Sequence, residues 1–129
     1  MPKFKFAKLV RDKIVEHQLA SGARPSFRQL NPDEHKRELV NKVIEEAKEI
    51  TQASPQEVAA EIADVQQALD DLRKLYGLKR QEIAKEQANK SKKNGDFAMG
   101  LYVDYVEVDD DNSWIDYYHE NADRYPEIQ

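Results

Sequence analysis

Two clear helix-start signals, close together in the chain, constrain this fold more than any other feature of the sequence. In Asn-Pro-Asp-Glu at residues 31–34, the asparagine can cap free backbone amides, the proline suits the first helical position, and the two acids complement the helix dipole. Ser-Pro-Gln-Glu at residues 54–57 has the pattern of a capping box with a proline inside it. Because only a short turn separates the two predicted helices, we expect them to pack antiparallel as a helical hairpin.

Further elements are predicted on either side of this hairpin. One helix covers residues 8–20 and ends at Gly22, and another covers residues 79–93 and ends at Gly95. Residues 101–106 alternate between two faces, which is typical of a strand. We therefore expect a mainly α chain, an antiparallel bundle of about four helices with a short C-terminal β element, in a domain of residues 1–112. Residues 113–129 hold the only tryptophan and three of the six tyrosines, which indicates an aromatic extension packed on the domain or on a neighbouring subunit.

Length and composition exclude several classes of protein. The 129 residues suit one domain, and Asp plus Glu outnumber Lys plus Arg by 25 to 20. The net charge of −5 argues against a nucleic acid polymer or an anionic membrane as partner. The absence of cysteine excludes disulfides, thiolate zinc sites and cysteine nucleophiles, and no Walker-type loop, Gly-x-Ser-x-Gly motif or histidine triad is present. With no long apolar run and no signal-like start, we expect a cytoplasmic protein.

Two pairs of acidic residues lie on helix faces that are otherwise apolar. In the first helix of the hairpin, Glu46 falls about 20° from a leucine of the apolar stripe, and Glu49 falls about 60° further round. Glu45 points almost opposite to the stripe, so we expect it in solvent. In the second helix, Glu61 lies inside the apolar stripe and Asp64 lies at its edge.

Antiparallel packing of the two helices would bring these acids together. An ionised carboxylate at such a position costs several kcal/mol unless it is paired or metal-bound. Hard oxygen ligands without cysteine select Mg²⁺, Mn²⁺ or Ca²⁺, and the lack of a Glu-x-x-His motif argues against a di-iron site. The candidate metal ligands are Glu46, Glu49, Glu61 and Asp64. The alternative is that Lys42, Lys48 or Arg73 neutralises these acids in ordinary ion pairs.

A metal site of this kind predicts a polyphosphate substrate. Magnesium keeps open coordination positions that substrate phosphates normally fill. Basic side chains near both ends of the predicted bundle could bind the remaining phosphate charge, namely Lys8, Arg11, Lys13 and Lys90. The alternative for both basic clusters is that they are exposed, charged helix ends.

The motifs together resemble those of the MazG-like all-α NTP pyrophosphatases, in particular the small single-domain, phosphoribosyl-ATP pyrophosphohydrolase-like group with a house-cleaning role. The resemblance runs in order from residue 8 to residue 108. It is carried by Lys-Leu-Val-Arg-Asp-Lys-Ile at 8–14, Glu-Glu-Ala-Lys-Glu at 45–49, Glu-Ile-Ala-Asp at 61–64, Lys90, and Asn-Gly-Asp-Phe at 94–97. It implies an oligomeric helical bundle that binds Mg²⁺ through the four acids named above, with Lys90 contacting phosphate. Where the family has Arg-Gly-Gly-Phe, this chain has Asn94, Gly95, Asp96 and Phe97, so one cation is lost and one acid is gained.

The expected activity is Mg²⁺-dependent hydrolysis of a nucleoside triphosphate between its α and β phosphates, giving a nucleotide monophosphate and pyrophosphate, with Mn²⁺ as an alternative cofactor. Water would attack the α-phosphorus in line, and Glu49 or Glu46 would accept its proton. We expect a homodimer or homotetramer that clears non-canonical nucleotides. Two alternatives are a non-catalytic Mg²⁺-nucleotide sensor, suggested by Asn94 and Asp96, and a helical protein-interaction module whose aromatic tail docks on a partner.

Overall fold

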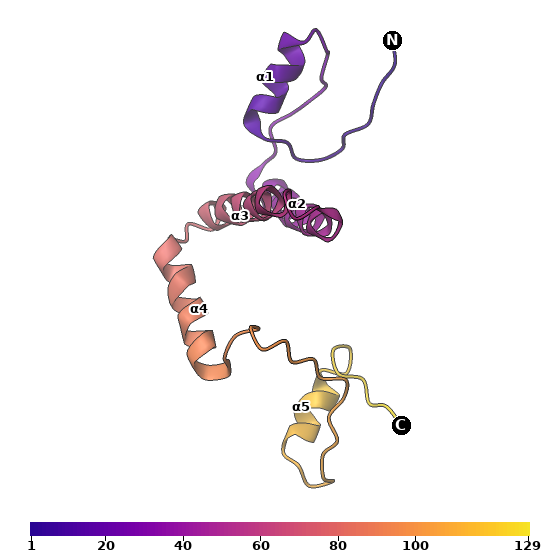
Figure 1. Ribbon diagram of the computed structural model, residues 1–129, viewed down its shortest axis with the longest axis vertical. Coiled ribbons are helices and arrows are strands. Elements are labelled where there is room, and N and C mark those ends of the chain that lie inside the picture. The colour runs from indigo at the N-terminus through magenta and orange to yellow at the C-terminus, as the bar shows by residue number, and fades with distance from the viewer. The chain divides into compact units, whose positions relative to one another are not determined.

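The computed structural model describes all 129 residues, and it is mainly helical. Its five helices are α1 (Asp12–Ala20), α2 (Pro32–Gln52), α3 (Val58–Leu75), α4 (Arg80–Asn94) and α5 (Trp114–Glu120) (Figure 1). The chain divides into two compact units, Met1–Lys90 and Ser91–Gln129, so residues 91–112 share a unit with the aromatic tail. None of the five helices combines the length and the apolar character needed to span a lipid bilayer.

The start of α2 follows the predicted capping pattern, whereas the start of α3 is modified. The backbone N–H of Glu34 donates to the Asn31 side-chain oxygen at 2.9 Å, and Pro32 occupies the first helical position. Before α3, the Ser54 hydroxyl donates to the Glu57 carboxylate at 2.7 Å, and residues 55–57 form a turn. Ser54 and Glu57 thus bond to each other instead of to backbone amides, and α3 begins at Val58.

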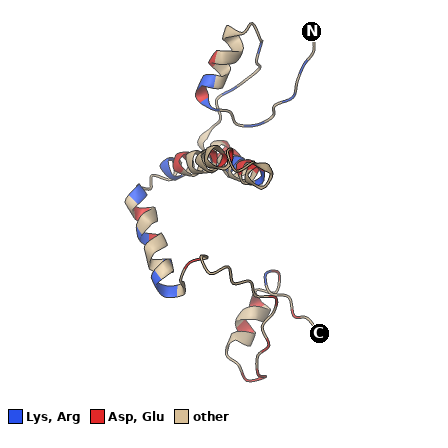
Figure 2. Cartoon of the chain, viewed as in Figure 1, with Lys and Arg blue, Asp and Glu red and all other residues tan.

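Helices α2 and α3 form the hairpin that holds the first unit together. They are the one pair of helices in extensive contact, and the short connection between them makes them antiparallel. Its most buried residues are Leu39 of α2 and Ala68 of α3, which are 3 % and 4 % exposed. By contrast, every residue of α4 is exposed, and this helix has lysines in its last turn, where the helix dipole favours cations (Figure 2). The prediction of a mainly α fold is confirmed, whereas the antiparallel bundle of about four helices is not, because only α2 and α3 are in extensive contact.

The second unit contains a helix that sequence patterns did not predict. The backbone N–H of Trp114 donates to the Asn112 side chain at 2.8 Å, just where α5 begins. Aromatic side chains pack against one another around α5, and Tyr118 and Tyr125 have ring centroids 5.4 Å apart at a steep angle. Short, aromatic helices of this kind lack the apolar periodicity that identifies longer amphipathic helices.

The short β element expected at residues 101–106 is not confirmed, because the structure contains no strand. These residues are non-helical and exposed, and Leu101 and Tyr102 are among the most exposed large side chains of the chain. An alternating sequence forms a strand only where another strand supplies hydrogen-bond partners. No second segment of this chain supplies them.

We predict that Leu39→Ala destabilises the first unit by about 2–3 kcal/mol, because it removes the largest well-buried side chain between α2 and α3. Urea denaturation followed by circular dichroism at 222 nm measures this change. Leu19→Ala, at an exposed position of α1, is the matched control and should change the unfolding free energy by less than about 0.5 kcal/mol. Equal effects of the two substitutions would show that α2 and α3 are not held together at Leu39.

Candidate metal centre

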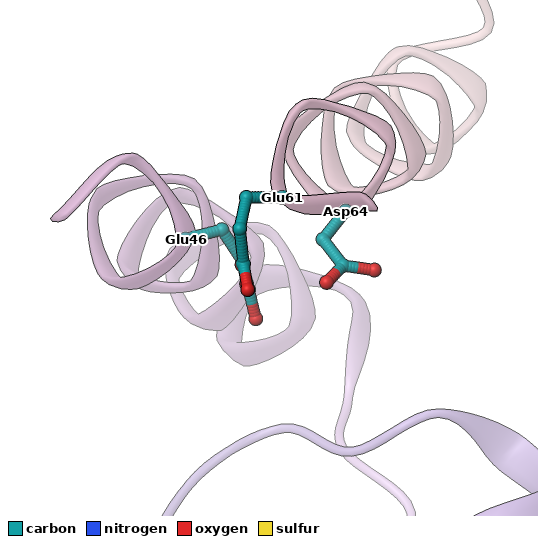
Figure 3. A group of neighbouring side chains, drawn as sticks. All are labelled: Glu46, Glu61 and Asp64. Atoms are coloured by element: carbon teal, nitrogen blue, oxygen red, sulfur yellow. The ribbon is translucent and has the colours of Figure 1, made fainter. Parts of the chain in front are cut away.

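Three acidic side chains meet between α2 and α3 (Figure 3). Glu46 comes from α2, and Glu61 and Asp64 come from α3, where they lie almost one turn apart and so project from the same side of the helix. Each residue offers a carboxylate oxygen, and these oxygens all lie within 4.8 Å of one another. All three residues are half-buried. The structure thus brings together three of the four residues that the sequence suggests as metal ligands.

Glu49, the fourth predicted ligand, lies outside this three-carboxylate cluster. It is exposed on α2, one turn beyond Glu46. Its charge nevertheless acts on the cluster, since it is one of the charges that raise the pKa of Glu61. On a helical wheel Glu49 lies further from the apolar stripe than Glu46, and in the structure Glu49 is accordingly the more exposed of the two.

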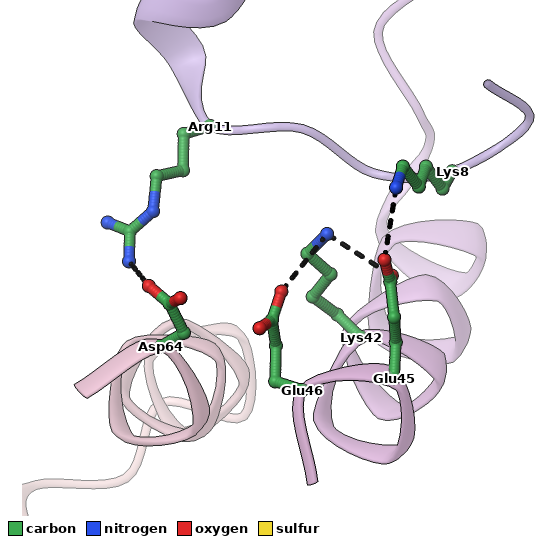
Figure 4. Close-up of polar contacts among 6 residues, drawn as sticks. All are labelled: Lys8, Arg11, Lys42, Glu45, Glu46 and Asp64. Carbon is green, nitrogen blue, oxygen red and sulfur yellow. Dashed lines mark hydrogen bonds and ion pairs between the residues drawn. The ribbon is translucent and has the colours of Figure 1, made fainter. Parts of the chain in front are cut away.

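Two cations bind the rim of the cluster (Figure 4). An Arg11 guanidinium nitrogen, Nη2, lies 2.6 Å from Asp64 Oδ1, and Lys42 Nζ lies 3.5 Å from Glu46 Oε1. Of the three residues considered as neutralising partners, only Lys42 contacts the cluster, because Arg73 pairs with Asp70 and Lys48 has no ion pair. Ion pairing therefore neutralises part of the cluster, and it does so mainly through a residue of the N-terminal segment.

The expectation that Glu45 lies free in solvent is wrong. Its carboxylate is half-buried and accepts hydrogen bonds from Lys8 at 3.1 Å and from Lys42 at 3.2 Å (Figure 4). Partial desolvation acts to raise the pKa of Glu45, but the two lysines outweigh it and the net pKa is lowered. A helical wheel places Glu45 correctly relative to the apolar stripe, but it contains no information on the N-terminal segment that brings Lys8 to this side of α2.

Glu61 is the member of the cluster without an ion-pair partner. Partial desolvation raises the pKa of its carboxyl group, and the negative charges of Glu46, Asp64 and Glu49 raise it further. The cluster therefore contains more negative charge than its two cations neutralise. Three converging carboxylates are donors of the type that Mg²⁺, Mn²⁺ and Ca²⁺ prefer, so the residues present fit a hard divalent cation.

The residues suggested as phosphate contacts are distributed unevenly. Lys8 and Arg11 lie beside the acidic side chains of α2 and α3, to which they are paired. Lys13 of α1 and Lys90 of α4 are exposed and form no ion pair. The remaining motif residues belong to the second unit, where Asn94 ends α4, Gly95 has a left-handed backbone with φ of 78°, and Phe97 is exposed.

A cavity next to the cluster was not predicted from the sequence. It has a volume of about 590 Å³ and lies among the N-terminal segment, α1, α2 and α3. Glu46 and Asp64 line it, together with Arg11 and Lys42, so it is continuous with the carboxylate cluster. The one sequence feature that could have indicated this cavity is the apolar pair Leu9 and Val10, which stands between charged residues. Both residues line the cavity.

Comparisons with known protein families, curated proteins and solved structures found no match for this chain.

We predict that Glu61→Gln stabilises the protein at pH 7 when divalent cations are removed with EDTA. The raised pKa means that the folded state holds the Glu61 proton more tightly than the unfolded chain does. The contribution of this group to the free energy of unfolding is therefore present below its ordinary pKa of 4.5 and is lost as the pH rises. Thermal unfolding should show a higher Tm for the variant at pH 7 and a difference that shrinks as the pH falls toward 4.5.

The control for this prediction is Glu86→Gln on α4, whose side chain forms no ion pair. Its Tm should follow the wild-type value across the same pH range. A Glu61→Gln protein that is no more stable than wild type at pH 7 would contradict the assignment of Glu61 to a site with excess negative charge.

Proposed function

We propose that this chain is a Mg²⁺-dependent nucleoside triphosphate pyrophosphohydrolase of the MazG-like type, which releases pyrophosphate and a nucleotide monophosphate and removes non-canonical nucleotides. The observation that carries the proposal is the meeting of Glu46, Glu61 and Asp64 between two packed helices, with basic side chains at the rim. The same residues belong to the sequence motifs that resemble this family. Carboxylates surrounded by cations are what joint binding of a metal ion and phosphates requires.

In this proposal Glu46, Glu61 and Asp64 hold the metal ion, whereas Glu49, the fourth predicted ligand, stays outside that set on the exposed side of α2. Bound Mg²⁺, or Mn²⁺ in its place, would supply neutralisation of phosphate charge and activation of the attacking water. Glu61 is the natural first ligand because it lacks a cation partner, whereas Asp64 must first release Arg11.

The basic residues of the N-terminal segment then bind phosphate. Arg11 and Lys8 pair with carboxylates at positions where more than a third of each cation's side chain is exposed, so the pairs are weak enough to exchange. A guanidinium can bind phosphate through two parallel hydrogen bonds, which favours Arg11 as the main contact. Lys13 and Lys90, which form no ion pairs, are further phosphate contacts in this proposal.

The proton of the attacking water goes most readily to a carboxylate that does not bind the metal ion. Glu49 is exposed and outside the three-carboxylate cluster, so it can accept the proton of the attacking water, with Glu46 as the second candidate. In-line attack on the α-phosphorus breaks its bond to the bridging oxygen, and pyrophosphate leaves with that oxygen.

The proposal includes a homodimer or homotetramer in which the predicted bundle is completed by a second hairpin. Ile62 and Leu69 of α3 and its C-cap residue Tyr76 recur at intervals of seven residues and so lie on one face, yet they are 43 %, 47 % and 58 % exposed. Val40 and Ile44 of α2 are similarly exposed. An apolar stripe of this regularity is typical of a helix–helix interface.

The proposed activity predicts pyrophosphate release from at least one member of a panel of normal and damaged nucleoside triphosphates, in Mg²⁺ and not in EDTA. Glu61→Gln should reduce the rate at least about a hundredfold because it removes a charged ligand that the metal requires. Enzyme-coupled detection of pyrophosphate measures the rate, and mass spectrometry confirms the monophosphate product.

Glu86→Gln serves as the matched control and should retain the wild-type rate. Wild-type protein that binds Mg²⁺ and nucleotide without releasing pyrophosphate would instead be the sensor, with Asn94 and Asp96 as the residues to test. If Mg²⁺ and nucleotide together do not raise the Tm, neither ligand binds the folded state preferentially, and the proposal is wrong.

The proposed association predicts that the purified chain has the mass of a dimer or tetramer in size-exclusion chromatography with light scattering. Leu69→Glu should shift the protein to monomer because it places a charge in the centre of the α3 stripe, while circular dichroism remains helical. Leu19→Glu, at an exposed position of α1, should leave the mass unchanged. A monomeric wild-type protein would exclude this interface.

A further inference from the structure

The open cavity beside the carboxylate cluster is large enough to hold a small molecule. Its volume of about 590 Å³ falls within the range of roughly 300–1,000 Å³ that is typical of ligand pockets. Along α2 it is lined from His35 to Glu46, which at 1.5 Å per residue corresponds to roughly 16 Å of helix. It therefore extends well beyond the three carboxylates.

The side chains that line the cavity differ in charge and polarity along the hairpin. At one end are Glu46 and Asp64, with Arg11 and Lys42 bound to them. Because α2 and α3 are antiparallel, the other end is at His35 of α2 and Asp71 of α3. Apolar side chains complete the wall: Phe6, Leu9, Val10, Ile14, Leu39 and Ala68. Charged groups at one end, an apolar wall and an acceptor carboxylate at the other end match a ligand that is ionic at one end and donates hydrogen bonds at the other.

Phe6 is the aromatic group of this cavity. The residue is 51 % exposed, and Lys8 Nζ lies 6.0 Å from the centroid of its ring. Ala7, between these two residues, has φ of 46°, a left-handed conformation that costs energy for a residue with a Cβ. The N-terminal segment thus turns sharply between its aromatic cavity residue and its first paired lysine.

Polar groups near the Asp71 end have unused hydrogen-bonding capacity. The Gln67 side-chain amide donates to Asp71 Oδ1 at 3.3 Å, which leaves the Gln67 carbonyl oxygen and the second Asp71 oxygen as free acceptors. The cavity lining thus includes both an aromatic ring, which can stack on a nucleobase, and free oxygen acceptors, which suit the N–H groups at its edge.

We propose that this cavity binds the nucleoside half of the nucleotide, with the base stacked on Phe6 and its N–H groups donated to Gln67 and Asp71. The assignment rests on the proposed function, because it takes the phosphates to lie at the end where Arg11, Lys42 and the three carboxylates meet. It adds a site for the base on the N-terminal segment and α3.

Isothermal titration in the presence of Mg²⁺ tests the assignment with two probes. One is a set of non-hydrolysable α,β-methylene analogues of the four common nucleoside triphosphates, and the other is inorganic tripolyphosphate, which has no base. Wild-type protein should bind the best analogue at least about tenfold more tightly than tripolyphosphate, since stacking on an aromatic ring accounts for a factor of this size. Phe6→Ala should remove most of that advantage and leave tripolyphosphate binding unchanged.

Two control variants, Phe4→Ala and Gln66→Ala, show whether a loss of affinity is specific to residues that line the cavity. Phe4→Ala changes the same residue type in the same segment, at a position 81 % exposed and outside the cavity, and should leave both affinities unchanged. Gln67→Ala should weaken the analogue several-fold, whereas Gln66→Ala, on the neighbouring position of α3 and outside the cavity, should not.

Equal wild-type affinity for the analogues and for tripolyphosphate would overturn the base site, and so would an equal loss of both in Phe6→Ala. In either case binding of tripolyphosphate would leave the proposed function standing. If wild-type protein binds neither probe, the proposed function and the base site both fail.

Discussion

The packing of α2 against α3 is the constraint on which the rest of the first unit depends. Burial of Leu39 and Ala68 stabilises the hairpin, and the same packing forces Glu46, Glu61 and Asp64 to within 4.8 Å of one another. Their mutual repulsion opposes the packing, so the hairpin needs cations at this point. Lys42 supplies one from within α2, and Arg11 supplies the other from the N-terminal segment. Electrostatic compensation, rather than a large apolar core, thus ties the N-terminal segment to the helices.

This arrangement also explains how a cavity forms beside so small a core. The N-terminal segment is held over the hairpin by the Lys8–Glu45 and Arg11–Asp64 pairs, and between these charged contacts the apolar side chains leave space. Exposed ion pairs of this kind contribute about 0–1 kcal/mol each, so the segment is held loosely enough for its cations to exchange partners. The Lys42–Glu46 pair is much less exposed, so water screens it less than the other two pairs.

Local patterns in the sequence predicted much of this structure and failed where distant segments meet. The cap at Asn31, the hairpin and the three clustered acids follow from capping chemistry and from a period of 3.6 residues, which depend only on neighbouring residues. The Lys8–Glu45 pair and the cavity required knowledge of where residues 1–13 lie, which no periodicity contains. The strand expected at residues 101–106 is not confirmed, because an alternating pattern does not show whether a second segment is present to pair with it.

The charge of the whole chain conceals an uneven distribution that bears on the proposed substrate (Figure 2). Residues 1–90 contain 17 basic and 15 acidic side chains, whereas residues 91–129 contain 3 and 10. The unit with the carboxylate cluster and the cavity is therefore net positive by 2, and the overall charge of −5 arises from the second unit. Salt screens charges beyond about 8–10 Å, so the field at a site is dominated by the charges near it and not by the net charge of the chain. An acidic sequence and a polyphosphate substrate are thus compatible in one chain.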